Sequence, residues 1–324
     1  MLEYIGKRLL QFIPVFFGVT FALFVIANYM PGADPIQMRY GERAVPPQIR
    51  AQLEEQLGLN QPVWVQYGKY LNDLLHGDLG VSNQTGRPVS TILAETYPYT
   101  LRLAVFAIIV EIIVGVGAGI ISAVKQYSFW DVFVTLSTSI AVALPVFWLG
   151  ILLQWFFGIW LKEATGGAFY LPISGAESAQ FGPFAHMILP GITLAAVSTA
   201  YAARIMRSQL LEVNGQDYVR TARAKGLSGR QVLWKHSFKN AMIPVVTFIG
   251  LDFGAMLAGA VLTETVFNWP GVGFTIARAI LQRDFPIVFG GVTVILFGVM
   301  IVNLAVDVSY AFLDPRIRFG GSEE

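Results

Sequence analysis

Residues 217–244 read Asp-Tyr-Val-Arg-Thr-Ala-Arg-Ala-Lys-Gly-Leu-Ser-Gly-Arg-Gln-Val-Leu-Trp-Lys-His-Ser-Phe-Lys-Asn-Ala-Met-Ile-Pro, a polar and basic stretch between two apolar blocks. The wider range 204–239 carries eight Lys or Arg residues, opposed only by Glu212 and Asp217. Excess positive charge beside membrane spans is typical of the cytoplasmic side. A position on the cytoplasmic side would explain the positive charge. It would not explain the helix start and stop signals that the stretch also contains.

Helix start and stop signals divide the basic stretch into two parts. Asp217 is a good N-cap residue and Gly226 is a good C-terminal stop, so the spacing predicts a short helix over Tyr218–Lys225. Ser228 followed by Gln231 forms a capping-box pattern that opens a second helix, which continues into the next apolar block. A short capped helix joined to a membrane helix is suited to mechanical contact with something outside the bilayer. Tyr218 and Ala222 are four residues apart and share one face of this helix, so we expect an aromatic side chain beside a small residue to face the partner.

The composition is that of a membrane protein with several spans. Of the 324 residues, 55% are apolar and 13% are charged, against about a quarter charged in soluble domains. Several apolar runs exceed the length of about 20 residues that crosses a bilayer. The chain contains no Cys and only three widely separated His residues, so we expect no disulfide and no metal site. A net charge of +1 gives no indication of nucleic-acid binding.

We predict six membrane spans, with both termini and the basic stretch in the cytoplasm. Their approximate bounds are 9–30, 103–124, 132–155, 187–206, 242–266 and 287–312. The first block is longer than the core of a signal peptide, so we expect it to be retained. Gly115, Gly117 and Gly119 predict a close-packing surface in the second span, and Pro145 predicts a kink in the third.

These spans divide the chain into four parts. They are the N-terminus with the first span (1–30), an extracytoplasmic subdomain (31–98), a five-helix core with a cytoplasmic loop at 208–240 (99–312), and a cytoplasmic tail (313–324). Within the subdomain, proline starts and glycine stops predict helices over 47–57 and 62–75. One face of the second helix is apolar, so we expect it to pack on another element; its residues are Trp64, Tyr67, Leu71, Leu74 and Leu75.

The sequence carries no recognisable catalytic constellation. The Gly6-Lys7 and Gly68-Lys69 pairs are not followed by Ser or Thr, so no phosphate-binding P-loop is present and the chain is not expected to hydrolyse ATP. No paired carboxylates, nucleophile elbow or zinc-protease pattern appears.

Intramembrane carboxyl groups are the remaining candidates for chemistry. An ionised group at the middle of a span, such as Glu111, costs a few kcal/mol unless it is paired or hydrated. Glu111 therefore either makes a structural hydrogen bond or lines a hydrated translocation path, and the sequence leaves both open. For Asp252 and Asp307, we favour structural roles.

The basic stretch resembles the coupling loop of the membrane subunits of bacterial ABC importers. Residues 217–226 match the form Asp-Tyr-Val-x-Thr-Ala-x-Ala-Lys-Gly of dipeptide and oligopeptide permeases. Arg220 and Thr221 stand where the general loop has Glu and its first Ala, whereas Ala222 and Gly226 fit. Further matching stretches are Pro31-Gly32, residues 66–82, His236 with Lys239-Asn240-Ala241 and Ile243-Pro244, residues 263–273 with Arg283-Asp284-Phe285-Pro286, and Asp307, Tyr310 and residues 314–318.

This resemblance implies an all-α type I permease fold and the first of two membrane subunits in the bacterial inner membrane. It assigns ATPase coupling to Asp217, Tyr218, Val219, Arg220, Thr221, Ala222, Arg223, Ala224, Lys225 and Gly226, and an outer-loop motif to Glu264, Pro270, Gly271 and Gly273. It also implies a second permease subunit, two ATPase subunits that bind ATP and Mg, and an extracytoplasmic peptide-binding protein. Short peptides would enter the cytoplasm. Nickel, glutathione and some sugar importers share this membrane-subunit family, so their solutes remain alternative substrates.

Two other classes of function compete with this interpretation. A self-contained secondary transporter or channel could use Glu111 and Asp252 as proton or ion sites. A membrane enzyme would need a catalytic constellation, which the sequence does not supply. The capped basic helix favours the importer subunit because a secondary transporter has no need of a docking element for an ATPase.

Overall fold

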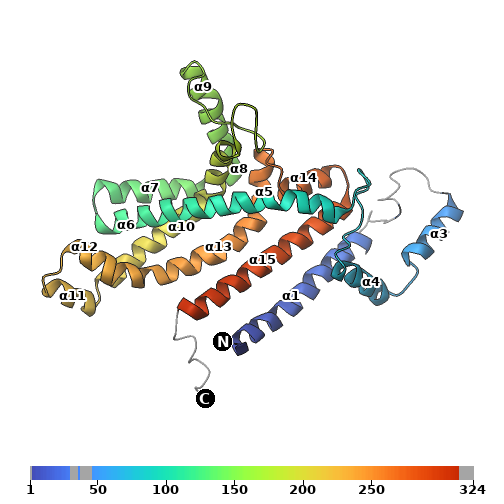
Figure 1. Ribbon diagram of the computed structural model, residues 1–324, viewed down its shortest axis with the longest axis horizontal. Coiled ribbons are helices and arrows are strands. Elements are labelled where there is room, and N and C mark those ends of the chain that lie inside the picture. The colour runs from blue at the N-terminus through green and yellow to red at the C-terminus, as the bar shows by residue number, and fades with distance from the viewer. Residues whose placement is uncertain (1, 30–35, 37–45, 314–324) are drawn as a thin grey trace.

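The computed structural model describes residues 2–29, 36 and 46–313, and within these ranges the regular structure is helical (Figure 1). This confirms the predicted all-α class. The α-helices are α1 (Leu2–Tyr29), α3 (Pro47–Leu57), α4 (Val63–Leu75), α5 (Val89–Val110), α6 (Gly117–Val124), α7 (Phe129–Ala143), α8 (Val146–Leu153), α9 (Leu161–Ala164), α10 (Pro183–Asn214), α11 (Asp217–Ala224), α12 (Gly229–Gln231), α13 (Phe238–Val266), α14 (Val272–Leu281) and α15 (Phe285–Leu313). Three π-helical segments, η1 (Glu111–Val116), η2 (Gln154–Trp160) and η3 (Val232–Ser237), continue neighbouring helices without a break.

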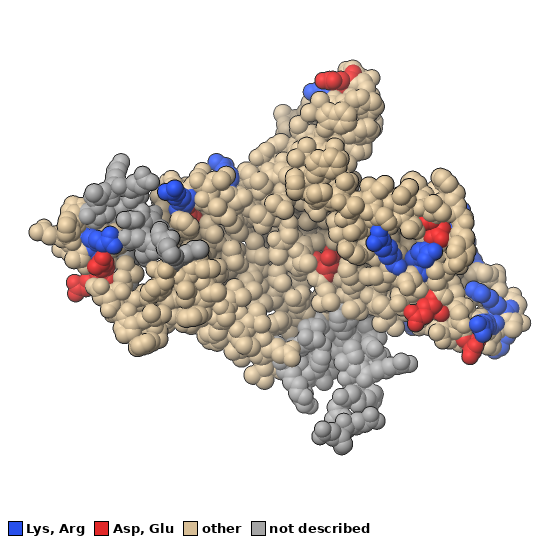
Figure 2. All heavy atoms as spheres, turned by 180° about the vertical axis from the view of Figure 1, so that it is seen from behind, with Lys and Arg blue, Asp and Glu red and all other residues tan. Residues whose placement is uncertain are grey.

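Charged side chains are concentrated toward the two ends of the long axis and at the tip of the arm that carries α9. Figure 2 shows Lys, Arg, Asp and Glu in these places, and one acidic spot on the otherwise uncharged middle of the body. Among the described residues, five helical runs are long and apolar enough to cross a membrane: Val89–Val124, Val146–Ala164, Pro183–Asn214, Gly229–Val266 and Phe285–Val306. The apolar part of α1, Leu10–Ile26, and helix α7 are shorter. The count of six spans therefore stays a prediction.

Helix α10 is the central element of the bundle. It contacts α5, η1, α6, α7, α8 and α13. Two of the three predicted packing glycines lie against it. A Cβ at Gly115 would lie 2.9 Å from the carbonyl oxygen of Thr199, and one at Gly119 would lie 2.6 Å from that of Ala203, whereas Gly117 faces open space. The close-packing surface is thus formed by glycines four residues apart, which share one helix face.

The predicted third span is broken rather than kinked. Leu144 is extended, with φ −86° and ψ 133°, and it separates α7 from α8. Pro145 explains the break because its ring disfavours the helical conformation of the preceding residue. Helix α7 packs on α6 and α10. In Figure 1, α8 and α9 then turn away from the bundle.

A buried ion pair fixes the order of helices at the end of the bundle near α11. Arg207 of α10 donates two hydrogen bonds to Asp131 in the first turn of α7, with nitrogen–oxygen distances of 2.8 and 2.9 Å. Ser122 of α6 donates to the same carboxylate. Arg207, Ser122 and the amide of Tyr127 all donate to it, so the buried Asp131 holds α6, α7 and α10 together.

The outer segment between α1 and α5 contains the two predicted helices. α3 ends at Gly58 (φ 68°), and Gly77 (φ 75°) follows the end of α4, so both glycines adopt the left-handed backbone expected of helix stops. α5 starts at Val89, so the predicted boundary at residue 98 falls inside a helix. Pro98 removes only one backbone donor, and the packing of α5 on α10, α13 and α15 keeps the helix intact.

Only part of the predicted apolar face of α4 is packed. Tyr67 lies against α1, where its hydroxyl donates to the carbonyl oxygen of Phe17 at 3.1 Å. Trp64 and Leu75, in contrast, are 75% and 79% exposed. The residues Pro31-Gly32 and 314–318 and the side chains of Asp307 and Tyr310 lie outside the part of the chain that the structure describes.

Candidate functional site

Helix α11 forms the protruding element predicted in the basic stretch, with its start shifted by one residue. The N-cap is Gln216, and Asp217 is the first helical residue without a side-chain capping bond, so the predicted N-cap was wrong. Asp217 still places negative charge in the first turn, where the helix dipole favours it. At the other end, Lys225 is the C-cap and Gly226 has φ 81°. Amides of Gly226 and Leu227 donate to the carbonyl oxygens of Arg223 and Ala222 at 3.0 and 3.4 Å, which closes the helix.

The faces of α11 differ from the sequence prediction. Val219 and Ala222 are buried in a cluster with Met206 and Leu210 of α10. Ala222 is therefore not free to sit beside an aromatic knob for a partner, as predicted from its spacing to Tyr218. The remaining residues of the helix are exposed, namely Asp217, Tyr218, Arg220, Thr221, Arg223 and Ala224, as is Lys225. A partner approaching from outside would meet one tyrosine and a basic surface.

The segments on either side of α11 are held by local contacts, and Asn240 of α13 donates to the Tyr218 hydroxyl of α11 at 2.8 Å. Ser228 and Gln231 form the predicted capping box: the amide of Ser228 donates to the Gln231 side chain at 3.1 Å and the amide of Gln231 to the Ser228 hydroxyl at 3.4 Å. From this cap the helical run continues through η3 into α13. Ser237 donates to Asn214 at the end of α10 at 2.7 Å.

At the opposite end of the bundle, Glu264 contacts the other residues of the predicted outer-loop motif. It is fully buried, accepting from the hydroxyl of Thr100 at 2.6 Å and from the amide of Phe274 at 2.9 Å. The amide belongs to the first turn of α14, so Glu264 caps that helix from α13. Gly271, next to Pro270, and Gly273 lie so close that a Cβ on either would collide with the carboxylate. The motif is thus one compact structural unit.

A second buried carboxylate, Asp284, connects the outer segment to α15. It accepts from the Ser82 hydroxyl at 2.5 Å and from the amides of Asn83 and Gln84 at 3.1 and 3.3 Å. Both partners lie in stretches that carry the family resemblance. Nothing in their local sequence indicates that they pair, because some 200 residues separate them. In the structure, the stretch that ends at Ser82 and the stretch that contains Asp284 contact each other through this hydrogen bond.

Glu111 lies close to Asp252, a proximity that the sequence spacing did not indicate. It is fully buried at the start of the π-helical segment η1, and neither carboxyl oxygen has a hydrogen-bond partner among the described residues. The carboxyl group of Asp252 on α13 is next to it, and Ser198 of α10 lies beside Asp252. Asp252 is partly exposed, so the pair extends from the interior to the surface of the bundle. π-helical segments occur frequently at functional sites, where they re-aim side chains.

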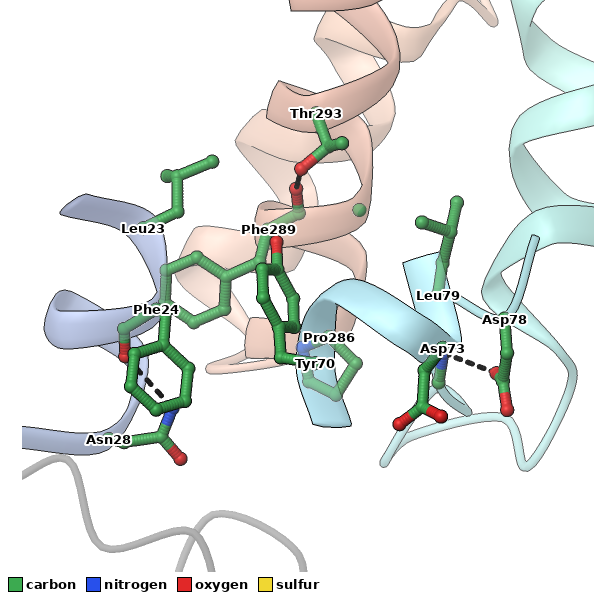
Figure 3. Close-up of a pocket in the computed structure, with 12 residues that line it drawn as sticks. Leu23, Phe24, Asn28, Tyr70, Asp73, Asp78, Leu79, Pro286, Phe289 and Thr293 are labelled. Carbon is green, nitrogen blue, oxygen red and sulfur yellow. Dashed lines mark hydrogen bonds between the residues drawn. The ribbon is translucent and has the colours of Figure 1, made fainter. Parts of the chain in front are cut away.

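A cavity of about 280 Å³ lies between α1, α4 and α15 near the outer end. Figure 3 shows the rings of Phe24, Tyr70 and Phe289 around it, with the carboxylates of Asp73 and Asp78 along one edge. None of the predicted site residues lines it. It belongs to the packing of the outer segment on α1 and α15.

The chain matches known proteins over nearly its whole length. A profile described as the binding-protein-dependent transport system inner membrane component matches residues 115–319, and its N-terminal companion matches residues 1–104. The chain is 44% identical to the dipeptide transport system permease protein DppB of Alkalihalophilus pseudofirmus, covering 98% of this chain and 100% of the relative. Identity is 40% to the Escherichia coli protein of the same name, with coverage of 98% and 99%. It is 39% to the Escherichia coli glutathione transport system permease protein GsiC, with coverage of 98% and 100%. The chain therefore belongs to the family of binding-protein-dependent transport system inner membrane components.

Proposed function

We propose that the chain is the permease subunit of an ABC importer that moves short peptides into the cytoplasm. The observation that carries the proposal is α11, an exposed basic helix that packs through Val219 and Ala222 on α10 and through Tyr218 on Asn240 of α13. The relatives named for dipeptide transport support peptides as the substrate class. The glutathione permease relative makes glutathione a second candidate. Uptake of labelled dipeptides and glutathione by the purified complex in vesicles separates the two.

The importer would contain further chains. Two ATPase subunits would bind ATP and Mg and receive α11, a second permease subunit would complete the path, and a peptide-binding protein would dock at the outer end. We further propose six membrane crossings in the inner membrane, counting α7 with α8 as one, with both termini and α11 in the cytoplasm and residues 31–98 outside.

The orientation can be tested directly because the chain has no native cysteine. In intact cells, an impermeant thiol reagent should label Trp64→Cys on exposed α4, whereas Lys225→Cys should react only after lysis. The reverse pattern would invert the topology and leave α11 on the wrong side for an ATPase.

Gly226→Val should uncouple ATP hydrolysis from transport. A β-branched residue in left-handed backbone is strained by about 1–2 kcal/mol, so α11 should change its direction while the spans insert normally. We expect peptide uptake by the complex to fall at least about tenfold, a change of about 1.4 kcal/mol in the coupled step. Gly182→Val is the matched control because a Cβ at Gly182 meets no atom within 4 Å among the described residues and its backbone is not left-handed. Unchanged uptake by Gly226→Val would refute a coupling role for α11.

Glu111→Gln tests whether the buried pair lines the path. Peptides carry an ammonium end, which a carboxylate inside a low-dielectric bundle attracts strongly. The substitution keeps the shape and replaces the carboxyl group by an amide that cannot ionise, so uptake should fall about tenfold, and Asp252→Asn should act in the same direction. Exposed Glu177→Gln serves as the control. If Glu111→Gln transports peptides as the parent does, the residue is structural.

A further inference from the structure

A groove of about 730 Å³ opens between α11, α12 and the ends of α6 and α10. Two arginines line it, Arg223 from α11 and Arg230 from α12, together with apolar Val124, Leu211 and Leu233. No Asp or Glu is among its lining residues. The groove therefore combines concentrated positive charge with an apolar wall.

Neither arginine is neutralised by the protein. Both are exposed, and within the described part of the chain neither takes part in a salt bridge or a side-chain hydrogen bond. Arg220, also on α11, forms an ion pair, with its Nη1 3.6 Å from Oδ1 of Asp217, and it does not line the groove. Guanidinium groups match phosphate geometry through paired N–H donors, so two unpaired arginines facing one cavity suit a phosphate group.

Aromatic side chains indicate the depth of the groove in the membrane. Tyr127, Phe129 and Trp130, just beyond Val124, are exposed, and so is Trp234 on η3. Exposed Tyr and Trp at the ends of apolar spans are typical of the headgroup level of a bilayer. The apolar wall then faces acyl chains and the arginines face headgroups, which favours a lipid over a soluble anion.

We propose that this groove binds the phosphate of an anionic glycerophospholipid, held by Arg223 and Arg230 with the acyl chains along Val124, Leu211 and Leu233. Basic pockets between membrane helices are known to take such headgroups. The bound phosphate connects α11 to α12 beside the ends of α6 and α10. Lipid thereby sets the position of α11. This inference requires only a membrane boundary at the groove and is independent of which solute is transported.

Native mass spectrometry of the purified complex, titrated with phosphatidylglycerol or phosphatidylcholine, tests the site. The parent should retain phosphatidylglycerol preferentially. The double variant Arg223→Gln, Arg230→Gln should lose at least about tenfold in affinity for it, or about 1.4 kcal/mol, with phosphatidylcholine unaffected. Arg220→Gln on the same helix should bind as the parent does.

Four outcomes would overturn the proposal. If the parent and the double variant bind phosphatidylglycerol equally, the lipid binds elsewhere. If Arg220→Gln loses as much affinity for phosphatidylglycerol as the double variant, the loss reflects net charge and not this groove. Displacement of phosphatidylglycerol by millimolar inorganic phosphate assigns the arginines to a soluble anion. Loss of the lipid when the ATPase subunits are attached, compared with the complex stripped of them, assigns the groove to protein side chains.

Discussion

Glu264→Ala should lower the melting temperature of the purified protein sharply. The substitution removes a buried acceptor from the Thr100 hydroxyl and the Phe274 amide. A buried donor without a partner costs about 1–3 kcal/mol, and the cavity left behind adds to that loss. We expect a total of about 3 kcal/mol or more. Differential scanning fluorimetry in detergent measures the change.

Local measurements distinguish this mechanism from general destabilisation. Amide hydrogen exchange should accelerate first in α14, because that helix loses its cap. Glu264→Gln should fall between the parent and alanine, since its amide can satisfy only one of the two donors as an acceptor. Exposed Glu163→Ala on α9 is the matched control and should melt as the parent does. If Glu264→Ala and Glu163→Ala melt together, Glu264 does not hold the outer end.

Gly119→Val should disrupt the bundle, whereas Gly117→Val should be tolerated. A Cβ at Gly119 would lie 2.6 Å from both the carbonyl oxygen of Ala203 and the Cβ of Met206, so α6 and α10 must move apart. Overpacking of this kind costs about 1–3 kcal/mol, and more where backbone must shift. At Gly117 nothing lies within 4 Å. The pair differs by two positions in one helix, so helix propensity and hydropathy are matched.

Both glycine variants should be compared by membrane expression, melting temperature and uptake. We expect Gly119→Val to lose folded protein and transport together, because the Arg207–Asp131 ion pair lies at the same α6–α7–α10 junction. Equal behaviour of the two variants would show that α6 and α10 are not in close contact in the membrane.

The local structure could largely be predicted from the sequence. The capping box at Ser228 and the glycine stops at Gly58, Gly77 and Gly226 follow from backbone chemistry within a few residues. Contacts between residues far apart in the chain could not be predicted from the sequence. The Ser82–Asp284 contact and the proximity of Asp252 to Glu111 depend on how distant helices pack, and no local spacing encodes that.

The prediction for α11 failed for a related reason. Spacing groups Tyr218 with Ala222, but it cannot tell whether a small residue on a short helix faces a partner or the chain's own core. Packing on Met206 and Leu210 decided that question. The third span shows the limit for proline: Pro145 marks an interruption, and the structure determines whether it bends or breaks the helix.

The two buried carboxylates at the outer end have a consequence for how that end can open. Asp284 fastens residues 82–84 to the start of α15, and Glu264 fastens α5 to α13 and α14. Each contact removes independent degrees of freedom from the loops that it joins. A gate for a peptide-sized solute therefore cannot form by the swinging of one loop. The outer ends of α5, α13, α14 and α15 are joined by these contacts, so we expect them to move together when the outer end opens.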